Sequence, residues 1–198
     1  MTAYRLGLTG SIGMGKSTTA AMFAAMGIPV WDADATVHRL YAPGGAATQA
    51  VGLLYPDVMR DGAVSRDRLR AKIAADGAVL DRVQAVVHPL VAADRAAFLA
   101  ASTAPIVLLD IPLLFETGAD AGCDGVVVVS APASVQRQRV LDRGGMTSAE
   151  FEMILARQMP DTEKRARATW VVETMDMEGA RMAVKSVISD IRQRLRHA

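Results

Sequence analysis

A glycine-rich stretch over residues 10–17 carries the strongest chemical signal in the sequence. It fits G-x-x-x-x-G-K-[ST], the spacing of loops that bind the phosphates of nucleoside triphosphates. Its glycines let backbone N–H groups turn inward around phosphate oxygens, and a following helix adds partial positive charge. In such a loop Lys16 would reach the β- and γ-phosphates, and the Ser17 hydroxyl would hold Mg²⁺.

The flanks of this phosphate loop agree with that interpretation. Residues 4–9 are short and mostly apolar, as in a buried strand, and residues 17–26 read as a helix that stops at Gly27. An ordinary glycine-rich turn would not need every fixed position of the motif. We therefore expect ATP and Mg²⁺ as cofactors, with the nucleotide contacting Ser11, Ile12, Gly13, Met14, Gly15, Lys16, Ser17 and Thr18.

Acidic residues end two further apolar runs. Residues 28–31 lead into Asp32-Ala33-Asp34, and residues 105–110 end at Asp110. Because open α/β sheets place ligands at the carboxyl ends of their strands, we expect these carboxylates to face the phosphate loop. Asp110 would contact Mg²⁺ directly or through water, and Asp34 would accept the proton of an attacking hydroxyl. The alternatives are a turn acid at Asp110 and a helix-capping acid at Asp34.

Basic residues gather between positions 137 and 167. Arg139 and Arg143 are four apart, on one helical face, and precede Gly144-Gly145, which could act as a hinge. This composition suits a lid whose arginines stabilise charge on a transferring phosphoryl group and exclude water. A solvated helix face is the alternative, because acidic residues are interleaved. The full basic set is Arg137, Arg139, Arg143, Arg157, Lys164, Arg165 and Arg167.

Strand patterns alternate with helical patterns, which predicts an α/β fold with a parallel sheet covered on both faces. The unbroken valines of residues 125–130 suit a buried parallel strand, and residues 169–173 read as the last strand. Helical patterns complete this alternation. They cover residues 131–143, a segment that begins with a capping box and runs to about residue 159, and residues 178–196.

The stretch from residue 43 to 101 interrupts the alternation. It holds amphipathic helical segments and no strand-like run, and it suits a helical insert that holds the second substrate. Ser65 could cap a helix starting at Arg66, and Pro89 predicts a kink or a break within the helical pattern of residues 78–101.

Length and composition set outer bounds. With 198 residues we expect one large domain or one domain with inserted subdomains, and a formal charge of +1 gives no bulk electrostatic case for nucleic acid. No run approaches the roughly 18 apolar residues of a membrane span, and no signal-peptide pattern opens the chain. A lone Cys123, read as a small core residue, suits a reducing cytoplasm.

Together the motifs resemble the dephospho-CoA kinase family, collinearly over about residues 4–175. The phosphate loop alone is generic, whereas the other segments in this order are more specific. The resemblance rests on residues 7–17, Asp32-Ala33-Asp34, His38, His88-Pro89-Leu90, Asp110-Ile111-Pro112-Leu113-Leu114-Phe115-Glu116, Gln136, Arg139, Arg143 and Gln158-Met159-Pro160.

The resemblance implies transfer of the ATP γ-phosphoryl group to the ribose 3′-hydroxyl of dephospho-CoA, the last step of coenzyme A synthesis. It implies a three-layer α/β/α phosphate-loop (P-loop NTPase) core over about residues 1–35, 102–138 and 161–198. It also implies a helical acceptor-binding insert over 36–101 and a small helical lid over 139–160.

The resemblance also implies roles for individual residues. It supports Lys16, Asp34, Arg139 and Arg143 as catalytic residues. It places an acceptor side at Asp34, His38, His88, Leu113, Leu114, Phe115 and Glu116. The chain departs from the family pattern at Gly144, where Asp or Asn is frequent, and at Thr169 and Thr174, where an Asp and an Asn are often seen. These departures concern the lid hinge and the adenine-side contacts.

Two other classes of function compete with this reading. Another small-molecule or nucleoside-monophosphate kinase would share the core and differ in its acceptor. A guanine-nucleotide switch would need an Asn-Lys-x-Asp motif, and the chain contains no Asn. We expect dephospho-CoA as the only partner, with no nucleic acid or membrane, and a cytoplasmic monomer or weak homo-oligomer.

Overall fold

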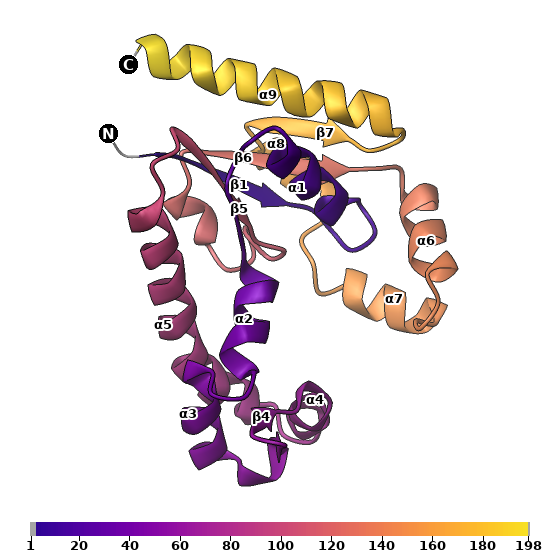
Figure 1. Cartoon of the computed structure of the whole chain (residues 1–198). Helices are drawn as coiled ribbons and strands as arrows, with labels where there is room; N and C mark the ends of the chain where they lie inside the picture. Colours follow the sequence, from indigo (N-terminus) through magenta and orange to yellow (C-terminus); the bar gives the residue numbers. More distant parts are fainter. Residues whose placement is uncertain (1–2, 198) are drawn as a thin grey trace. The chain divides into compact units, whose positions relative to one another are not determined.

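The structure, a computed structural model, describes residues 3–197, and the chain divides into two compact units. The first comprises Met1–Trp31 and Ser102–Ala198, and the second comprises Asp32–Ala101. Figure 1 shows the sheet of the first unit and the helices of the second.

A five-stranded sheet forms the centre of the first unit. Its strand order is β2 (Val30–Asp32), β5 (Ile106–Asp110), β1 (Tyr4–Thr9), β6 (Gly125–Ser130) and β7 (Trp170–Glu173). β1 pairs in parallel with β5 and with β6, and β6 pairs in parallel with β7. Every residue of β5 and β6 is buried, as parallel strands covered on both faces require. The carboxyl ends of these strands therefore share one edge of the sheet.

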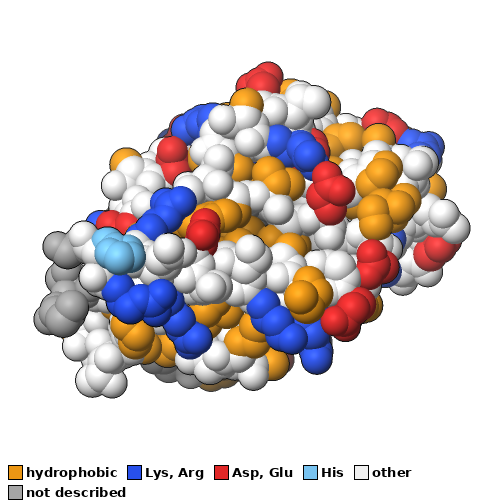
Figure 2. All heavy atoms as spheres, turned by 90° about the horizontal axis from the view of Figure 1, so that it is seen from above, with side chains coloured by type: hydrophobic (Ala, Val, Ile, Leu, Met, Phe, Trp, Pro, Cys, Tyr) orange, Lys and Arg blue, Asp and Glu red, His pale blue; other side chains and the backbone are white. Residues whose placement is uncertain are grey.

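Of the helices in the first unit, α1 (Lys16–Ala25), α8 (Asp161–Arg167) and α9 (Met177–His197) pack against the sheet. α6 (Ala133–Asp142) packs against α7 (Ser148–Leu155), and a short 3-10 turn lies at Ala119–Gly122. On α9 the residues Val184, Val187, Ile188 and Ile191 are buried at helical spacing, and they join Leu6 and Leu8 of β1 in one core. Figure 2 shows a face on which Lys and Arg side chains lie among acidic and hydrophobic ones.

The predicted helix after the capping box is shorter than expected. Thr147 and Glu150 form the complete capping box, but α7 ends at Leu155 rather than near residue 159. Pro160 disfavours a helical conformation at Met159, and the Met159 N–H instead donates to the Glu116 carboxylate at 2.8 Å. The segment that returns from α7 is thereby tied to the loop that follows β5.

The second unit has its own core and contains a hairpin that we did not predict. Its elements are α2 (Ala33–Tyr41), α3 (Ala46–Leu54), a 3-10 turn at Pro56–Val58, β3 (Met59–Arg60), β4 (Ala63–Val64), α4 (Arg66–Ala75) and α5 (Ala78–Ala101). The expectation of no strands is wrong at β3 and β4, which pair antiparallel. Asp61 and Gly62 join them with φ of 50° and 77°, and Asp-Gly is a known hairpin signal.

α5 (Ala78–Ala101) is one helix through Pro89. Of the two expected outcomes the break is therefore wrong, and the kink stays a prediction. A proline removes one backbone N–H, and the helix retains its other bonds while Val79, Val83 and Val87 pack in the core of the second unit. Among the described residues α5 is also long and apolar enough to cross a membrane by length and composition. One such helix is weak evidence for a membrane protein, because core helices pass the same test.

Candidate active site

The phosphate loop has little room around it. Gly13 and Gly15 have φ of 79° and 92°, a conformation that glycine adopts readily. A Cβ atom at Gly13 would lie 2.6 Å from a Val140 methyl group, and one at Gly10 would lie 2.3 Å from a Val129 methyl group. The glycines therefore serve both the turn and the close packing of the loop.

The loop lysine contacts the acid that ends β5. Lys16 Nζ lies 2.6 Å from Asp110 Oδ1, and the Asp110 side chain is 3% exposed. Ser17, in the first turn of α1, is exposed beside Lys16. The hydroxyl and carboxylate oxygens of Ser17 and Asp110 are ligands that fit Mg²⁺. No cluster of three or more His, Cys, Asp or Glu occurs in the described part of the chain, and Mg²⁺ bound with a nucleotide needs none.

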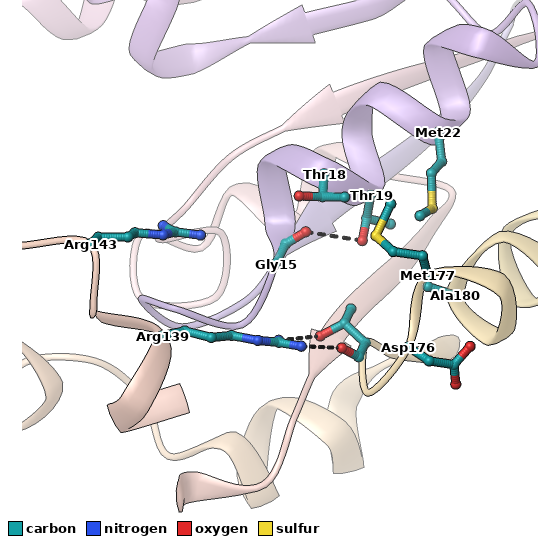
Figure 3. A pocket seen from close by; sticks show the side chains of 10 residues that line it. Gly15, Thr18, Thr19, Met22, Arg139, Arg143, Asp176, Met177 and Ala180 are labelled. Carbon is teal, nitrogen blue, oxygen red and sulfur yellow. Dashed lines mark hydrogen bonds between the residues drawn. The ribbon is translucent and has the colours of Figure 1, made fainter. Parts of the chain in front are cut away.

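Arg139 and Arg143 line one cavity together with the start of α1. The cavity has a volume of about 190 Å³. Figure 3 shows the Arg143 side chain pointing toward Gly15, whereas the Arg139 side chain extends to its hydrogen-bond partner Thr174. Arg139 donates to Thr174 Oγ1 at 3.0 Å and to the Thr174 carbonyl oxygen. The lining residues are Gly15, Thr18, Thr19, Met22, Arg139, Arg143, Thr174, Asp176, Met177 and Ala180.

Three other arginines of the basic set form ion pairs at the surface. Arg137 pairs with Glu152, Arg165 with Glu173 and Arg167 with Asp120. These pairs are partly exposed, as in a solvated charged face. Arg139 and Arg143 differ from the other residues of the basic set because they line the cavity beside Gly15.

Thr174 joins the end of β7 to the phosphate loop. Its hydroxyl donates to the Met14 carbonyl oxygen at 2.8 Å, and its N–H donates to the Ser130 carbonyl oxygen at 2.9 Å. The same hydroxyl accepts the bond from Arg139. A chain of hydrogen bonds therefore runs from α6 through Thr174 to the backbone of the loop.

Two glutamines bind the main chain of Ile12 in the same loop. Gln136 Nε2, on α6, donates to the Ile12 carbonyl oxygen at 2.7 Å. Gln158 Oε1, between α7 and α8, accepts from the Ile12 N–H at 3.1 Å. Both polar atoms of this residue are therefore held by side chains from outside the loop.

Glu116 forms a buried ion pair with Lys164. Glu116 Oε1 lies 2.8 Å from Lys164 Nζ, and the Lys164 side chain is fully buried. Burial is the largest influence and would raise the pKa of Glu116, but the bonds from Lys164 and the Met159 N–H together lower it below its ordinary value. These contacts hold the carboxylate within the first unit, so its expected contact with the acceptor stays a prediction.

The other residues expected on the acceptor side after β5 differ in exposure. Leu113 is 41% exposed, whereas Leu114 and Phe115 are buried. The guanidinium of Arg167 lies 4.4 Å from the centre of the Phe115 ring. Of these three side chains, Leu113 is the most exposed, and the expected acceptor contact of Phe115 stays a prediction.

In the second unit, the N-cap of α2 is Asp32 rather than Asp34. Asp32 Oδ1 accepts from the Ala35 N–H at 2.9 Å, which leaves the Asp34 carboxylate exposed in the first turn. His38 lies four residues later on the same helical face and is exposed, as is His88 on α5.

α2 is fixed to α5 through Asp94. The buried Thr36 hydroxyl lies 3.1 Å from Asp94 Oδ1, and Arg39 donates to the same carboxylate at 3.1 Å. This anchor holds the inner face of α2 against α5, so its exposed face with Asp34 and His38 keeps a fixed orientation within the second unit.

Comparison with known proteins places this site in a family. A model of dephospho-CoA kinase matches residues 4–178. The chain belongs to the dephospho-CoA kinase family. It is 62% identical over 193 residues to dephospho-CoA kinase of Cereibacter sphaeroides, covering 98% of each chain, and 56% identical over 190 residues to that of a Jannaschia species, covering 96% and 97%.

Two solved structures share the fold of this chain. TT1252 from Thermus thermophilus is 35% identical, with a TM-score of 0.87 over 96% of this chain and 98% of that one. A dephospho-CoA kinase from Campylobacter jejuni shares the fold at 16% identity, with a TM-score of 0.66 and the same coverage. The predicted α/β phosphate-loop kinase fold is thus confirmed.

In this member of the dephospho-CoA kinase family, sequence reasoning gave no role to several residues around the loop. Gln136 and Gln158 carried the resemblance without a stated function, and Thr174 stood out only as a departure from the family pattern. Lys164 appeared as one more basic residue on a charged helix. Sequence patterns do not show which of these side chains reach the loop, because their partners lie up to 160 residues away in the chain.

Proposed function

We propose that this chain transfers the γ-phosphoryl group of ATP to the ribose 3′-hydroxyl of dephospho-CoA, giving coenzyme A and ADP. Membership of the dephospho-CoA kinase family supports both the kinase activity and the acceptor. The observation that carries the proposal is an intact phosphate loop, with Lys16 in contact with Asp110, in a chain that matches this family over residues 4–178.

The phosphate loop would hold the triphosphate and prepare it for transfer. Its inward N–H groups and the N-terminus of α1 favour phosphate charge, and Lys16 still has donors to offer to β- and γ-oxygens. Ser17 and Asp110 would hold Mg²⁺. The ion, when bound, neutralises charge on the phosphate oxygens.

The acceptor hydroxyl would be activated by Asp34. An exposed carboxylate in the first turn of α2 is available to accept the 3′-hydroxyl proton as the oxygen attacks phosphorus. His38 lies on the same helical face and, with His88, Leu113, Phe115 and Glu116, is proposed for the acceptor side. Because kinases depend mostly on positioning and charge stabilisation, the carboxylate chiefly orients the nucleophile.

The cavity beside Gly15 suits the base of the nucleotide. Met22 and Met177 offer polarisable thioethers, and Arg139 offers a planar guanidinium that can stack on an aromatic ring. Arg143 lies at the C-cap of α6 before two glycines with positive φ, where a lid arginine can turn toward the γ-phosphate. The arginines would stabilise charge on the transferring group.

An ADP-release assay with Mg-ATP tests this function. Parallel reactions contain dephospho-CoA, shikimate, gluconate, pantothenate, a nucleoside monophosphate or no acceptor. We expect strong stimulation by dephospho-CoA alone, with coenzyme A as the product. Stimulation by another acceptor would leave the roles in the phosphate loop but overturn the substrate, and release without any acceptor dependence would favour a nucleotide switch. We further infer a cytoplasmic enzyme that acts as a monomer or weak homo-oligomer.

A further inference from the structure

Two segments that lie far apart in the sequence form hydrogen bonds to the main chain of Ile12 in the phosphate loop. Gln136 lies on α6, before the segment predicted to form a lid, and Gln158 lies where that segment returns. The two side-chain amides bind opposite polar atoms of the Ile12 main chain, at 2.7 and 3.1 Å. Their orientations follow from their partners, because a carbonyl oxygen only accepts and an N–H only donates.

The residue after Ile12 packs closely against α6. Gly13 requires its positive φ, and a Cβ there would lie 2.9 Å from the Gln136 carbonyl oxygen. Gln136 is 3% exposed, so the hydrogen bond from its side-chain amide to the Ile12 carbonyl oxygen is shielded from water. The two peptide groups that flank Ile12 are therefore held by Gln136 of α6 on one side and by Gln158 on the other.

Gln158 in turn has a rigid support. The next residue, Met159, donates its N–H to Glu116, and Glu116 pairs with the fully buried Lys164. Displacement of the returning segment would therefore break the ion-pair network or move Ile12. Gln136 is one helical turn before Arg139, so the other end of the segment is tied to the main chain of the same residue and to an arginine of the nucleotide cavity.

We propose that Gln136 and Gln158 are positioning residues that set the phosphate loop for the nucleotide and couple its shape to the segment 139–160. They act through the main chain of Ile12 and need not touch the substrate. Since they bind the two peptide groups that flank one residue, loss of either should loosen the same part of the loop. The inference rests on the proposed ATP binding by this loop.

Isosteric neutral variants test the proposal. Gln158→Met and Gln136→Met each remove one hydrogen bond at nearly constant volume, and Gln138→Met, at an exposed position on α6, is the matched control. We expect kcat/KM for ATP to fall about tenfold in the first two variants, about the effect of losing one buried hydrogen bond, with KM for dephospho-CoA unchanged. The double variant should lose little more than either single one, because both bonds hold the main chain of one residue.

Amide hydrogen exchange without added nucleotide gives a readout independent of activity. Exchange at Ile12 should accelerate in Gln158→Met and stay slow in Gln158→Glu, whose carboxylate still accepts the N–H. Gln136→Glu, which offers no donor for the Ile12 carbonyl oxygen, should behave like Gln136→Met and loosen the loop around Gly13.

Three outcomes would overturn the proposal. In the first, the Met variants match Gln138→Met in both kinetics and hydrogen exchange. In the second, the losses of kcat/KM in the two single variants add up in the double variant. In the third, KM for dephospho-CoA rises as much as kcat/KM for ATP falls. The last result, with a lower melting temperature, would show general destabilisation. Activity of the parent and of Gln138→Met tests the proposed function separately, so failure of one proposal is distinguishable from failure of the other.

Discussion

Lys16 Nζ and Asp110 Oδ1 lie 2.6 Å apart, which joins the first turn of α1 to the last position of β5. The pair is largely buried, with 15% and 3% of the two side chains exposed. It fixes the lysine next to the backbone that would hold the triphosphate. It also brings together the two residues for which the sequence predicts contacts to phosphate and to Mg²⁺.

Removing the ammonium group should abolish transfer. For Lys16→Ala we expect turnover to fall by orders of magnitude, because the cation facing the β- and γ-phosphates is lost. The alanine variant also leaves Asp110 without this partner, so a lower melting temperature is expected. Lys16→Arg keeps a cation for Asp110 and should retain the melting temperature while still losing turnover. Near-normal turnover in both variants would contradict the role of Lys16.

Asp34 offers a test of the base assignment with little effect on folding. Its carboxylate is exposed and Asp32 provides the cap of α2, so Asp34→Ala should leave the melting temperature within about 1 °C of the parent. Turnover at saturating substrates should fall about 10²- to 10⁴-fold, the usual contribution of a general base. Steady-state kinetics with dephospho-CoA measures this fall. Retained turnover would show that another group orients the hydroxyl.

Replacing either of the two cavity arginines should lower activity, but only one of the two replacements should also lower the melting temperature. Arg143→Ala changes an exposed side chain and should lower kcat more than it raises KM for dephospho-CoA. Arg139→Ala also breaks the bonds to Thr174 and should lower the melting temperature as well. Arg137→Ala, which loses the surface pair with Glu152, the bond to Ser148 and the contact with the Phe151 ring, lies outside the cavity; it is the control and should keep normal kcat. A change confined to acceptor affinity in Arg143→Ala would place that residue outside the phosphoryl chemistry.

The elements of the first unit could be predicted because local patterns agreed with the fold. The phosphate loop, the valine run of β6 and the capping box at Thr147 each depend on residues close together in the sequence. The hairpin at Asp61-Gly62 was also encoded locally, but its strands of two residues are too short to show alternation. The course of α5 through Pro89 depends instead on packing within the second unit, which outweighs the local cost of proline.

The residues expected to contact the nucleotide could be predicted from the sequence, whereas the residues that hold the phosphate loop in place could not. Lys16 and Asp110 are linked by a motif and by a rule for strand ends, so their proximity followed from topology. Gln158 and Lys164 act through partners that no pattern connects to them, since uncharged amides and a lysine within a basic helix have many ordinary roles. Their importance appears only when the distances to Ile12 and Glu116 are known.

The Glu116–Lys164 pair predicts a specific dependence of stability on pH. The folded protein lowers the pKa of Glu116 from its ordinary value of 4.5, so the ionised carboxylate stabilises the fold. This contribution is complete above about pH 4.5 and is lost as pH falls through the lowered folded pKa. At pH 7, Glu116→Gln should be about 3–5 kcal/mol less stable than the parent, because the buried Lys164 charge loses its counter-ion.

Urea unfolding at several pH values between 3 and 7 measures this difference. The gap between parent and Glu116→Gln should shrink on acidification, since the parent carboxylate then becomes neutral too. Glu163→Gln, at an exposed position on α8, should show no such gap. Combining Glu116→Gln with Lys164→Met removes both charges and should recover much of the stability at pH 7. A gap that stays constant with pH, or a double variant as unstable as Glu116→Gln alone, would show that the ion pair is not what stabilises this part of the fold.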